Sequence, residues 1–373
     1  MDKVIVVGAG CFGTSLAWRL ARAGVAVTLV DQFAPGDARA SSGGESRLLR
    51  CAHGSDARYA VLARRARTLW RELEAETGEE LLLEHGVAWF AHGEQGWEVA
   101  SEAVLADLGI PVQRLAPEAA GALFPSFSGE DLAFVLLEPE AGVLRAAAAV
   151  GALSAAARAR GVCLERARAR PAARAVLLDD GRRLRADVVV WACGAWLAEL
   201  FPGLVELRST RQELFFLDGG PLWAGAGVPG WVDYDAAMYG TGDVDGLGVK
   251  LAPDSEGPEL GPDEPLPPAS TEGERAARDY ARRRFPALAG APLHSARTCR
   301  YELTADSHFV MAEHPEHPGV WLLGGGSGHG FKHGPALAEL LCGVLAGNAD
   351  PPAHFAVGSR RPARSLRTAG SGR

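Results

Sequence analysis

The run Val4-Ile5-Val6-Val7-Gly8-Ala9-Gly10-Cys11-Phe12-Gly13 lies near the start of the chain and decides its fold. Four consecutive apolar, β-branched residues predict a strand that is buried on both faces, as in a parallel sheet. Three glycines follow with the spacing G-x-G-x-x-G, and a helical pattern continues from Thr14 to Ala23. A second apolar run, 25–30, ends at Asp31. This strand, glycine turn, helix and acid-terminated strand predict a Rossmann-type dinucleotide-binding unit.

The glycines and the acid of this unit each have a physical role. Gly8 permits a tight turn, Gly10 lets the backbone approach a pyrophosphate, and Gly13 lets the helix pack closely on the strand. The helix N-terminus adds partial positive charge for the phosphates, and Asp31 can accept a hydrogen bond from a ribose hydroxyl. The motif alone leaves FAD and NAD as alternatives. The residues predicted to contact the cofactor here are Gly8, Gly10, Cys11, Phe12, Gly13 and Asp31.

The composition is that of an ordinary folded protein. The 373 residues are 47% hydrophobic and 23% charged, and the net charge of -8 is spread along the chain. We therefore expect neither nucleic acid nor a membrane surface as a partner. The chain shows no signal-peptide pattern and no apolar run near the roughly 20 residues of a membrane helix. Six scattered cysteines predict reduced thiols and a cytoplasmic protein. His314 and His317 predict a surface turn, so no metal site is expected.

Later segments predict an α/β (α+β) fold with two interleaved domains. The runs 187–192 and 320–323 are strand-like and end in glycine-containing turns, which suits the nucleotide-binding domain. Between them, short apolar runs such as 87–90 and 132–137 alternate with turns, which is typical of antiparallel strands. The predicted division is a nucleotide-binding domain from 1–80, 141–206 and 293–350, an inserted substrate domain from 81–140 and 207–292, and a mobile tail at 351–373.

Several separated motifs together resemble one known family. With the glycine motif, and in the same order, they span almost the whole chain: Glu45–Arg50, Glu138–Val143, Gly246–Leu251, Thr298–Tyr301 and Gly326–Lys332. The chain resembles the monomeric sarcosine oxidase family of flavoprotein amine oxidases, which includes N-methyltryptophan oxidase, pipecolate oxidase and cyclic-imino-acid oxidases. The resemblance implies an FAD enzyme that oxidises a secondary or cyclic amino acid to an imine and reduces oxygen to hydrogen peroxide. It also favours a monomer.

The resemblance implies a covalent bond to the flavin at Cys299. A thiolate can attack the flavin ring once cations lower its pKa, and Arg297 and Arg300 flank Cys299. A buried, inert cysteine is the alternative. The further residues that the resemblance assigns to the cofactor are Ser46, Arg47, Gly194, Cys299, Gly326, Gly328, Gly330 and Lys332.

The resemblance also assigns substrate and catalytic roles. Arg50 and Lys332 match a pair that binds the substrate carboxylate, and such cations suit a small anion. Lys250 matches a lysine that promotes reaction with oxygen, and Arg47 a flavin-proximal arginine. Tyr301 matches an active-site tyrosine. The alternatives are a helix start at the surface for the two arginines, solvated lysines, and a core-filling tyrosine.

Two positions depart from the sarcosine oxidase pattern. Asp254 stands where those enzymes have a histidine, and Gly43 replaces another histidine before Arg47. Asp254 can bind a substrate N–H or act as a base, so we count it among the substrate-binding and catalytic candidates; a turn acid is the alternative. Sarcosine itself is therefore in doubt as the substrate.

Three other functions stay open at the level of sequence. One is a flavin-dependent dehydrogenase that passes electrons to a carrier, and another is a non-catalytic flavin-binding protein. The third is an NAD-dependent dehydrogenase. The sequence does not identify the amino acid that is oxidised.

Overall fold

The N-terminal strand, glycine turn and helix form as predicted. The computed structural model describes residues 1–224, 227–363 and 365–367. Strand β1 (Lys3–Val7) leads into α1 (Cys11–Arg22), and the chain returns through β2 (Ala26–Asp31). β1 and β2 pair in parallel along their length.

β1 and β2 belong to a six-stranded sheet whose members are far apart in the chain. Its order is β19-β20-β13-β1-β2-β9, and β19 runs antiparallel to β20 while the other pairs are parallel. The strand predictions at 187–192 and 320–323 are confirmed by β13 and β20. The additional strands are β9 (Cys163–Arg166), β13 (Val188–Trp191), β19 (Val310–Glu313) and β20 (Val320–Gly324).

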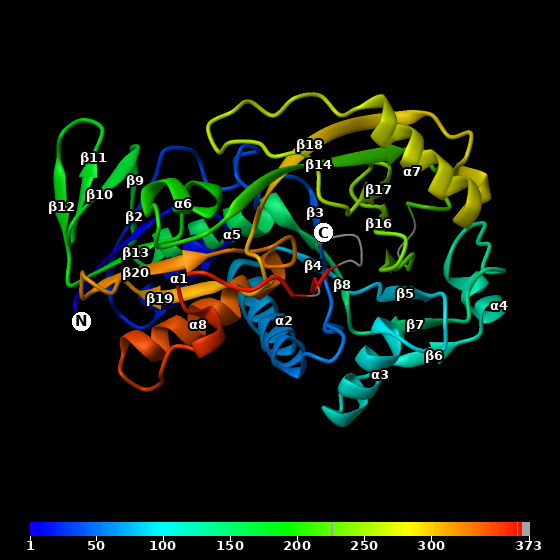
Figure 1. Ribbon diagram of the computed structural model, residues 1–373, viewed down its shortest axis with the longest axis horizontal. Helices are drawn as coiled ribbons and strands as arrows, with labels where there is room; N and C mark the ends of the chain where they lie inside the picture. The colour runs from blue at the N-terminus through cyan, green and yellow to red at the C-terminus, as the bar shows by residue number, and fades with distance from the viewer. Residues whose placement is uncertain (225–226, 364, 368–373) are drawn as a thin grey trace.

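Alternate residues of β1 pack on opposite faces of this sheet. Val4 and Val6 belong to the core shared with four helices, whereas Ile5 and Val7 belong to the core on the other face. The helices are α1, α2 (Ala57–Thr77), α5 (Ala146–Ala159) and α8 (Gly334–Leu345). The other face is covered by a small sheet, drawn at the left of Figure 1, and a short helix: β10 (Ala169–Ala172), β11 (Ala175–Leu178), β12 (Arg183–Arg185) and α6 (Leu197–Leu200).

A second, eight-stranded sheet occupies the other end of the molecule (Figure 1). Its order is β18-β14-β17-β16-β15-β5-β7-β6, and every neighbouring pair is antiparallel except β15 and β5. The strands are β5 (Val87–Ala91), β6 (Gln113–Leu115), β7 (Phe134–Glu138), β14 (Arg208–Leu217), β15 (Gly230–Asp233), β16 (Met238–Asp243), β17 (Val249–Pro253) and β18 (Leu293–Leu303).

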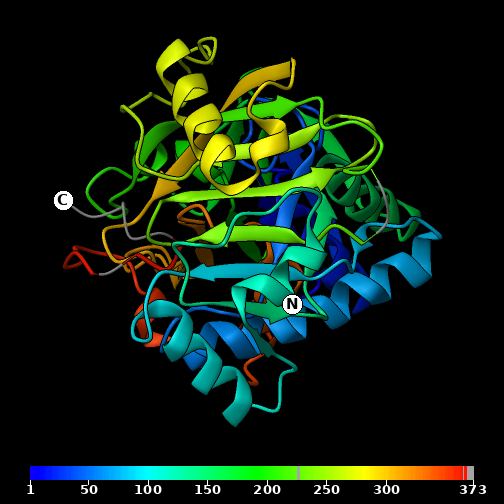
Figure 2. The same cartoon turned by 90° about the vertical axis from the view of Figure 1, so that its right-hand side faces the viewer.

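Helix α7 (Thr271–Arg284) covers one face of this sheet, as Figure 2 shows. Phe215 and Leu251 of the sheet share a buried core with Ala277 and Tyr280 of α7. Because side chains alternate along a strand, the residues between these apolar positions face the opposite side. That opposite side is turned toward the nucleotide-binding sheet and carries much of the candidate site.

A three-stranded sheet, β3-β8-β4, connects the two larger sheets. It consists of β3 (Ser46–Leu49), β4 (Leu82–Leu83) and β8 (Gly142–Arg145). The other helical segments are α3 (Trp97–Asp107), α4 (Pro117–Ala120), η1 (Gly121–Leu123), η2 (Gly194–Trp196), η3 (Pro286–Leu288), η4 (Phe331–His333) and η5 (Ala353–Phe355). In the part of the chain that the structure describes, no helix is long and apolar enough to cross a membrane.

The structure corrects two details of the predicted domain division. The sequence assigned 293–350 to the nucleotide-binding domain, but β18 (Leu293–Leu303) lies in the eight-stranded sheet because it pairs along its length with β14. The sequence assigned 81–140 to the substrate domain, but Leu82 and Leu83 pair with β8 of the connecting sheet. Both pairings join distant segments, which a local sequence pattern does not reveal.

The structure also corrects the prediction of a mobile tail at 351–373. The chain after α8, red in Figure 1, runs back toward the middle of the molecule. Phe355 and Leu366 are buried in the main core, and Arg367 is only 3% exposed. The apolar residues in this polar segment provide the physical reason, since they remove surface from water. The prediction for residues 364 and 368–373 lies outside the described residues.

The first glycine of the motif lies where a strand of the same sheet approaches closely. Gly8 has a φ of +107°, and a Cβ atom built there would lie 2.2 Å from the carbonyl oxygen of Ala192. The Gly8 N–H donates to the Val30 carbonyl at 2.8 Å, so the backbone cannot easily move aside. The position therefore requires glycine for two reasons, its left-handed φ and the lack of space.

Comparison of Gly8→Ala with Gly24→Ala separates these two reasons. Gly24 also has a positive φ, of +79°, but no atom lies within 4 Å of the place that a Cβ would take there. We expect Gly24→Ala to lower the free energy of unfolding by about 1 kcal/mol and Gly8→Ala by roughly 2–4 kcal/mol. Urea denaturation monitored by circular dichroism measures both values. Equal losses would contradict the close approach.

Candidate functional site

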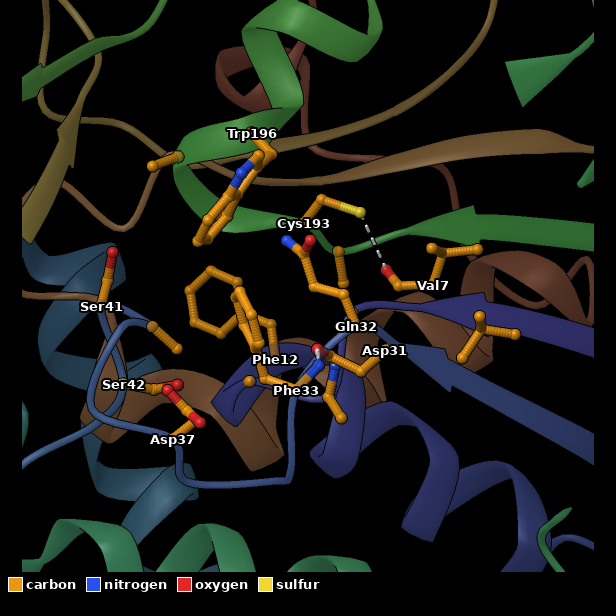
Figure 3. A pocket seen from close by; sticks show the side chains of 18 of the residues that line it. Val7, Phe12, Asp31, Gln32, Phe33, Asp37, Ser41, Ser42, Cys193 and Trp196 are labelled. Carbon is orange, nitrogen blue, oxygen red and sulfur yellow. Dashed lines mark hydrogen bonds between the residues drawn. The ribbon is translucent and has the colours of Figure 1, made fainter. Parts of the chain in front are cut away.

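A cavity of about 700 Å³ extends along the carboxyl ends of the nucleotide-binding strands. Figure 3 shows how Phe12, Phe33 and Trp196 surround it, with Asp31 and Gln32 at the end of β2. Such a crevice at the strand ends of an open α/β sheet is where nucleotides bind. Of the predicted cofactor residues, those that line it are Gly8, Gly10, Cys11, Phe12, Asp31, Arg47, Gly194, Gly326, Gly328 and Gly330.

The glycine turn and Asp31 form the floor of this cavity. Gly10 caps the start of α1, and a Cβ there would lie 3.0 Å from the Ser42 hydroxyl. Asp31 accepts hydrogen bonds from the backbone N–H of Ala9 at 2.5 Å and of Phe33 at 2.6 Å. Burial raises its pKa, although these two hydrogen bonds act against the rise. Each Asp31 oxygen keeps a lone pair for a ribose hydroxyl.

Gly13 has a structural role and does not line the cavity. A Cβ at Gly13 would lie 1.8 Å from the Gly8 carbonyl oxygen. This is the close helix-to-strand packing that the motif predicts for its third glycine.

The glycine-rich turn after β20 closes the opposite end of the cavity. The Gly326 N–H donates to the buried carboxyl group of Glu302 at 3.2 Å, and Ser327 N–H donates to the Glu302 carbonyl at 2.9 Å. A Cβ at Gly330 would lie 2.7 Å from the Gly326 Cα, so the turn tolerates no side chain there. Glu302 also lines the cavity and was not singled out from the sequence.

A smaller cavity, of about 50 Å³, adjoins the large one. Arg47, Tyr301, Gly328 and Phe331 line both and form the boundary between them. The small cavity brings together the predicted substrate residues, because it is also lined by Arg50, Tyr301, Asp254 and Lys332. The remaining charged residue of its lining, Arg367, was not predicted from the sequence.

Arg47 is held at this boundary by backbone carbonyl groups. Its guanidinium donates to the carbonyl oxygens of Ser46 at 2.8 Å, Ser41 at 2.8 Å and Gly43 at 2.7 Å. Residues 46–49 form strand β3, so the alternative of a helix start at the surface is wrong for this arginine. The arrangement fixes a positive charge between the two cavities.

Arg50 is buried beside the Glu138 carboxylate, which binds the backbone just after Arg50. Glu138 accepts hydrogen bonds from the Cys51 N–H at 2.6 Å and from the Trp89 indole N–H at 2.8 Å. Arg50 lies over the Trp89 ring at 4.9 Å and donates to the Leu366 carbonyl at 3.1 Å. Burial lowers the pKa of Arg50 to about 10, and the Glu138 charge opposes that change. Arg50 therefore remains cationic near neutral pH, with donors left for a ligand.

Lys332 and three histidines lie together behind the small cavity. Lys332 Nζ donates to the His329 carbonyl at 2.9 Å, and burial holds its pKa well below the usual value. Ring nitrogens of His53, His329 and His333 lie within 4.8 Å of one another, a spacing that metal ligands share. Burial, and then the charges of Arg50 and Lys332, hold the pKa of His53 well below its usual value. The Arg50 charge would repel a metal ion, so we interpret the histidines as a neutral packing cluster.

One face of the eight-stranded sheet carries three of the predicted residues. Residues directly opposite in an antiparallel pair share a face. Cys299 pairs with Gln212, and Tyr301 with Thr210. Lys250 pairs with Phe216, which lies on the same face of β14 as Gln212 and Thr210. Lys250, Cys299 and Tyr301 therefore project from the face opposite α7, toward the nucleotide-binding sheet.

Lys250 is buried where β17 meets β3. Its Nζ donates to the Ser46 carbonyl at 3.2 Å and the Ser46 hydroxyl at 3.4 Å, and lies 5.0 Å from the centre of the Tyr239 ring. Burial, and then the positive charge of Arg47, lower the pKa of Lys250 to about 7. Ser46 was predicted as a cofactor contact, but in the structure it holds Lys250 and is not among the described residues that line the large cavity.

Cys299 is half-buried, and burial raises the pKa of its thiol. The charges that oppose this rise come from Arg47 and Lys250. The sequence had suggested Arg297 and Arg300 for this purpose, but Arg297 pairs with Glu45, and Arg300 donates to backbone carbonyls such as that of Glu264 at 2.6 Å. Neither Cys299 nor Lys250 is among the described residues that line the two cavities.

Asp254 is buried and paired with the unpredicted Arg367. The Arg367 Nη1 donates to Asp254 Oδ1 at 2.6 Å and also to the Asp254 carbonyl. Burial raises the pKa of Asp254, and the Arg367 charge opposes the rise. Tyr301 lies beside this pair, with its hydroxyl 3.3 Å from that of Tyr239. A buried ion pair does not fit the alternative of an ordinary turn acid at Asp254.

The residues present fit an FAD molecule. The glycine turn offers backbone N–H groups and the N-terminus of α1, and Asp31 suits a ribose. The cavity is long enough to reach from Asp31 to Arg47 and Tyr301 at the small cavity.

Comparisons with known proteins agree with this fit. The model of the FAD dependent oxidoreductase (DAO) family matches residues 3–343, and the chain belongs to this family. A monomeric sarcosine oxidase from Bacillus sp. (strain NS-129) is 30% identical over 362 residues, which cover 91% of each chain. N-methyl-L-tryptophan oxidase from Yersinia pestis (strain Pestoides F) is 27% identical over 346 residues, covering 90% of this chain and 93% of that enzyme.

The fold is shared with solved structures as well. The crystal structure of L-proline dehydrogenase from P. horikoshii superposes with a TM-score of 0.81 at 20% identity, covering 94% of this chain and 95% of that one. The protein is thus an FAD-dependent oxidoreductase, and the predicted fold class, family resemblance and FAD cofactor are confirmed.

Proposed function

We propose that the protein oxidises a secondary or cyclic amino acid at its C–N bond, giving an imine, and passes the electrons to oxygen, giving hydrogen peroxide. The observation that carries this proposal is the small cavity lined by Arg50 and Lys332, which adjoins the FAD cavity across Arg47 and Tyr301. The relatives named for sarcosine and N-methyl-L-tryptophan support the same substrate class.

The chain's own side chains bind and orient the substrate. Arg50 and Lys332 hold the α-carboxylate, and Tyr301 forms the wall beside the reacting carbon. Asp254 accepts a hydrogen bond from the substrate nitrogen, and its raised pKa suits a group that can also take a proton. FAD, when bound, accepts the hydride equivalent and supplies the redox chemistry. A fixed positive charge at Arg47 favours an anionic, reduced cofactor.

Further proposals concern the surroundings of the reaction. The six free cysteines support a reducing, cytoplasmic location. We also propose that the protein acts as a monomer, with an amino acid and oxygen as its partners.

A screen of amino acids tests the proposed function. N-methyl and cyclic amino acids are added anaerobically, the flavin absorbance is followed, and peroxide is measured in air. We expect at least one such amino acid to bleach the flavin and to release one peroxide for each oxidation. Bleaching without peroxide would indicate a dehydrogenase that uses a carrier. A flavin that no amino acid bleaches would indicate a non-catalytic flavin-binding protein.

Lys250 is proposed to promote the reaction with oxygen through its charge. With a pKa of about 7, its amine is protonated below that pH and neutral above it. The rate of flavin reoxidation should therefore fall as pH rises through about 7. Lys250→Met should slow reoxidation by about 100-fold and remove this pH dependence. Lys250→Arg should keep the rate high and flat, because arginine stays protonated.

Stopped-flow mixing of reduced enzyme with oxygen measures these rates. Lys332→Met, which removes the other buried lysine, serves as the contrast and should slow flavin reduction more than reoxidation. Equal slowing of both half-reactions by Lys250→Met would contradict the proposed role.

Cys299 is proposed to bond covalently to the flavin. Two other cysteines, Cys11 and Cys193, line the large cavity, but each thiol contacts a backbone carbonyl, at 3.2 Å and 3.3 Å, and burial raises both pKa values strongly. After acid precipitation, we expect colour in the pellet for the wild type, Cys11→Ser and Cys193→Ser. Cys299→Ser should release its colour to the supernatant. Release from the wild type would overturn the bond.

A further inference from the structure

The segment after α8 contributes to the small cavity although it lies beyond the residues that match the family model. The Tyr234 hydroxyl donates to the Ser365 carbonyl at 2.9 Å, and Arg50 donates to the Leu366 carbonyl at 3.1 Å. Leu366 is buried in the main core. These contacts attach the segment beside the cavity, and Arg367 lines it.

Arg367 occupies a place that the glycine-rich turn leaves open. A Cβ at Gly328 would lie 2.6 Å from Arg367 Cδ and 2.8 Å from Tyr301 Cε2. The guanidinium carbon of Arg367 lies 5.1 Å from the centre of the Tyr301 ring, and its Nη1 pairs with Asp254. Arg367 is thus one wall of the predicted substrate site.

The second terminal nitrogen of Arg367, Nη2, indicates that a ligand binds here. Nη2 is buried and has no hydrogen-bond partner among the described residues. A buried donor without an acceptor costs about 1–3 kcal/mol, and Asp254 does not engage the guanidinium with the two parallel bonds that arginine can make. An acceptor on the substrate would satisfy Nη2.

The charge of the cavity indicates what that acceptor is. Four arginine or lysine side chains line the cavity against a single carboxylate, Asp254. Arg50 and Lys332 hold one substrate carboxylate. Arg367 then has only Asp254 as a carboxylate partner in the lining of the cavity. A second substrate carboxylate would take the free Nη2 in a charge-assisted hydrogen bond, the stronger kind.

We propose that Arg367 is a substrate-binding residue that selects secondary amino acids carrying a second carboxylate. The proposal rests on the proposed function for the amino-acid class, but its binding component can be measured without turnover. The alternative, in which Arg367 only neutralises Asp254, predicts no such selection.

The first experiment measures binding to the FAD-loaded protein by perturbation of the flavin spectrum. Succinate and butyrate are four-carbon acids that differ in the second carboxylate. We expect succinate to bind the wild type about tenfold or more tightly than butyrate, and Arg367→Gln to bring the ratio near one. Arg361→Gln, at an exposed position of the same segment, should keep the wild-type ratio. A wild-type ratio near one, or an unchanged ratio in Arg367→Gln, would overturn the proposal.

The Arg367→Lys variant is a second test in case Arg367→Gln does not fold. Lysine keeps the charge but lacks the two terminal nitrogens with which arginine can bind Asp254 and a second carboxylate together. The preference for succinate over butyrate should therefore fall at least about threefold. A lysine variant with the full wild-type ratio would contradict the role of Nη2.

The second experiment compares anaerobic flavin reduction by N-methyl-DL-aspartate and N-methyl-DL-alanine. Faster reduction by N-methylaspartate that is lost in Arg367→Gln supports both proposals. Equal rates of flavin reduction by both compounds would contradict the selection by Arg367 but would still support the amine oxidase function. Selective binding of succinate, without reduction of the flavin by any amino acid, would contradict the oxidase function alone.

Discussion

The alternation of side chains on the eight-stranded sheet is the constraint on which the site depends. One face of β14 and β17 is buried against α7 through residues such as Phe215 and Leu251. That burial fixes the register, because a slip of one residue would expose every apolar side chain of the face. The opposite face must then carry Lys250, Cys299 and Tyr301. The hydrophobic core under α7 thus helps to position chemically active side chains on the other face of the sheet.

Burial also explains the electrostatics of these side chains. Taking Lys250, Arg50 and Lys332 out of water lowers the pKa of each, because the charged form loses hydration. The chain compensates with carbonyl groups and two buried carboxylates, Glu138 and Asp254. Because cations still outnumber carboxylates here, an anionic ligand gains stabilisation that it would not find in water. The same excess of positive charge therefore serves a substrate carboxylate and a reduced, anionic cofactor.

The sequence predicted those features that local chemistry determines. The Gly8–Gly13 turn was recognisable because only glycine fits a left-handed φ beside Ala192 or a helix packed on Gly8. The paired charges at Arg50 and Lys332 were recognisable because the motifs around them match a family in order. The family match also placed Cys299 and Tyr301, two residues apart and so on one face of a strand. Each motif is itself short, so its informative residues lie within a few positions of one another.

The features that the sequence did not predict depend on contacts between residues far apart in the chain. The two Ser46 oxygens accept from the Lys250 amine, a contact between β3 and β17 that no local pattern indicates. Arg367 follows a segment rich in proline, arginine and serine, which by composition indicated a mobile tail. A few buried groups, Phe355, Leu366 and the Arg367–Asp254 pair, outweigh that composition. Since Asp254 departs from the sarcosine oxidase pattern and its partner lies beyond the family match, the two residues form a pair that no local motif contains. The specificity of the cavity therefore depends on a contact between segments more than a hundred residues apart.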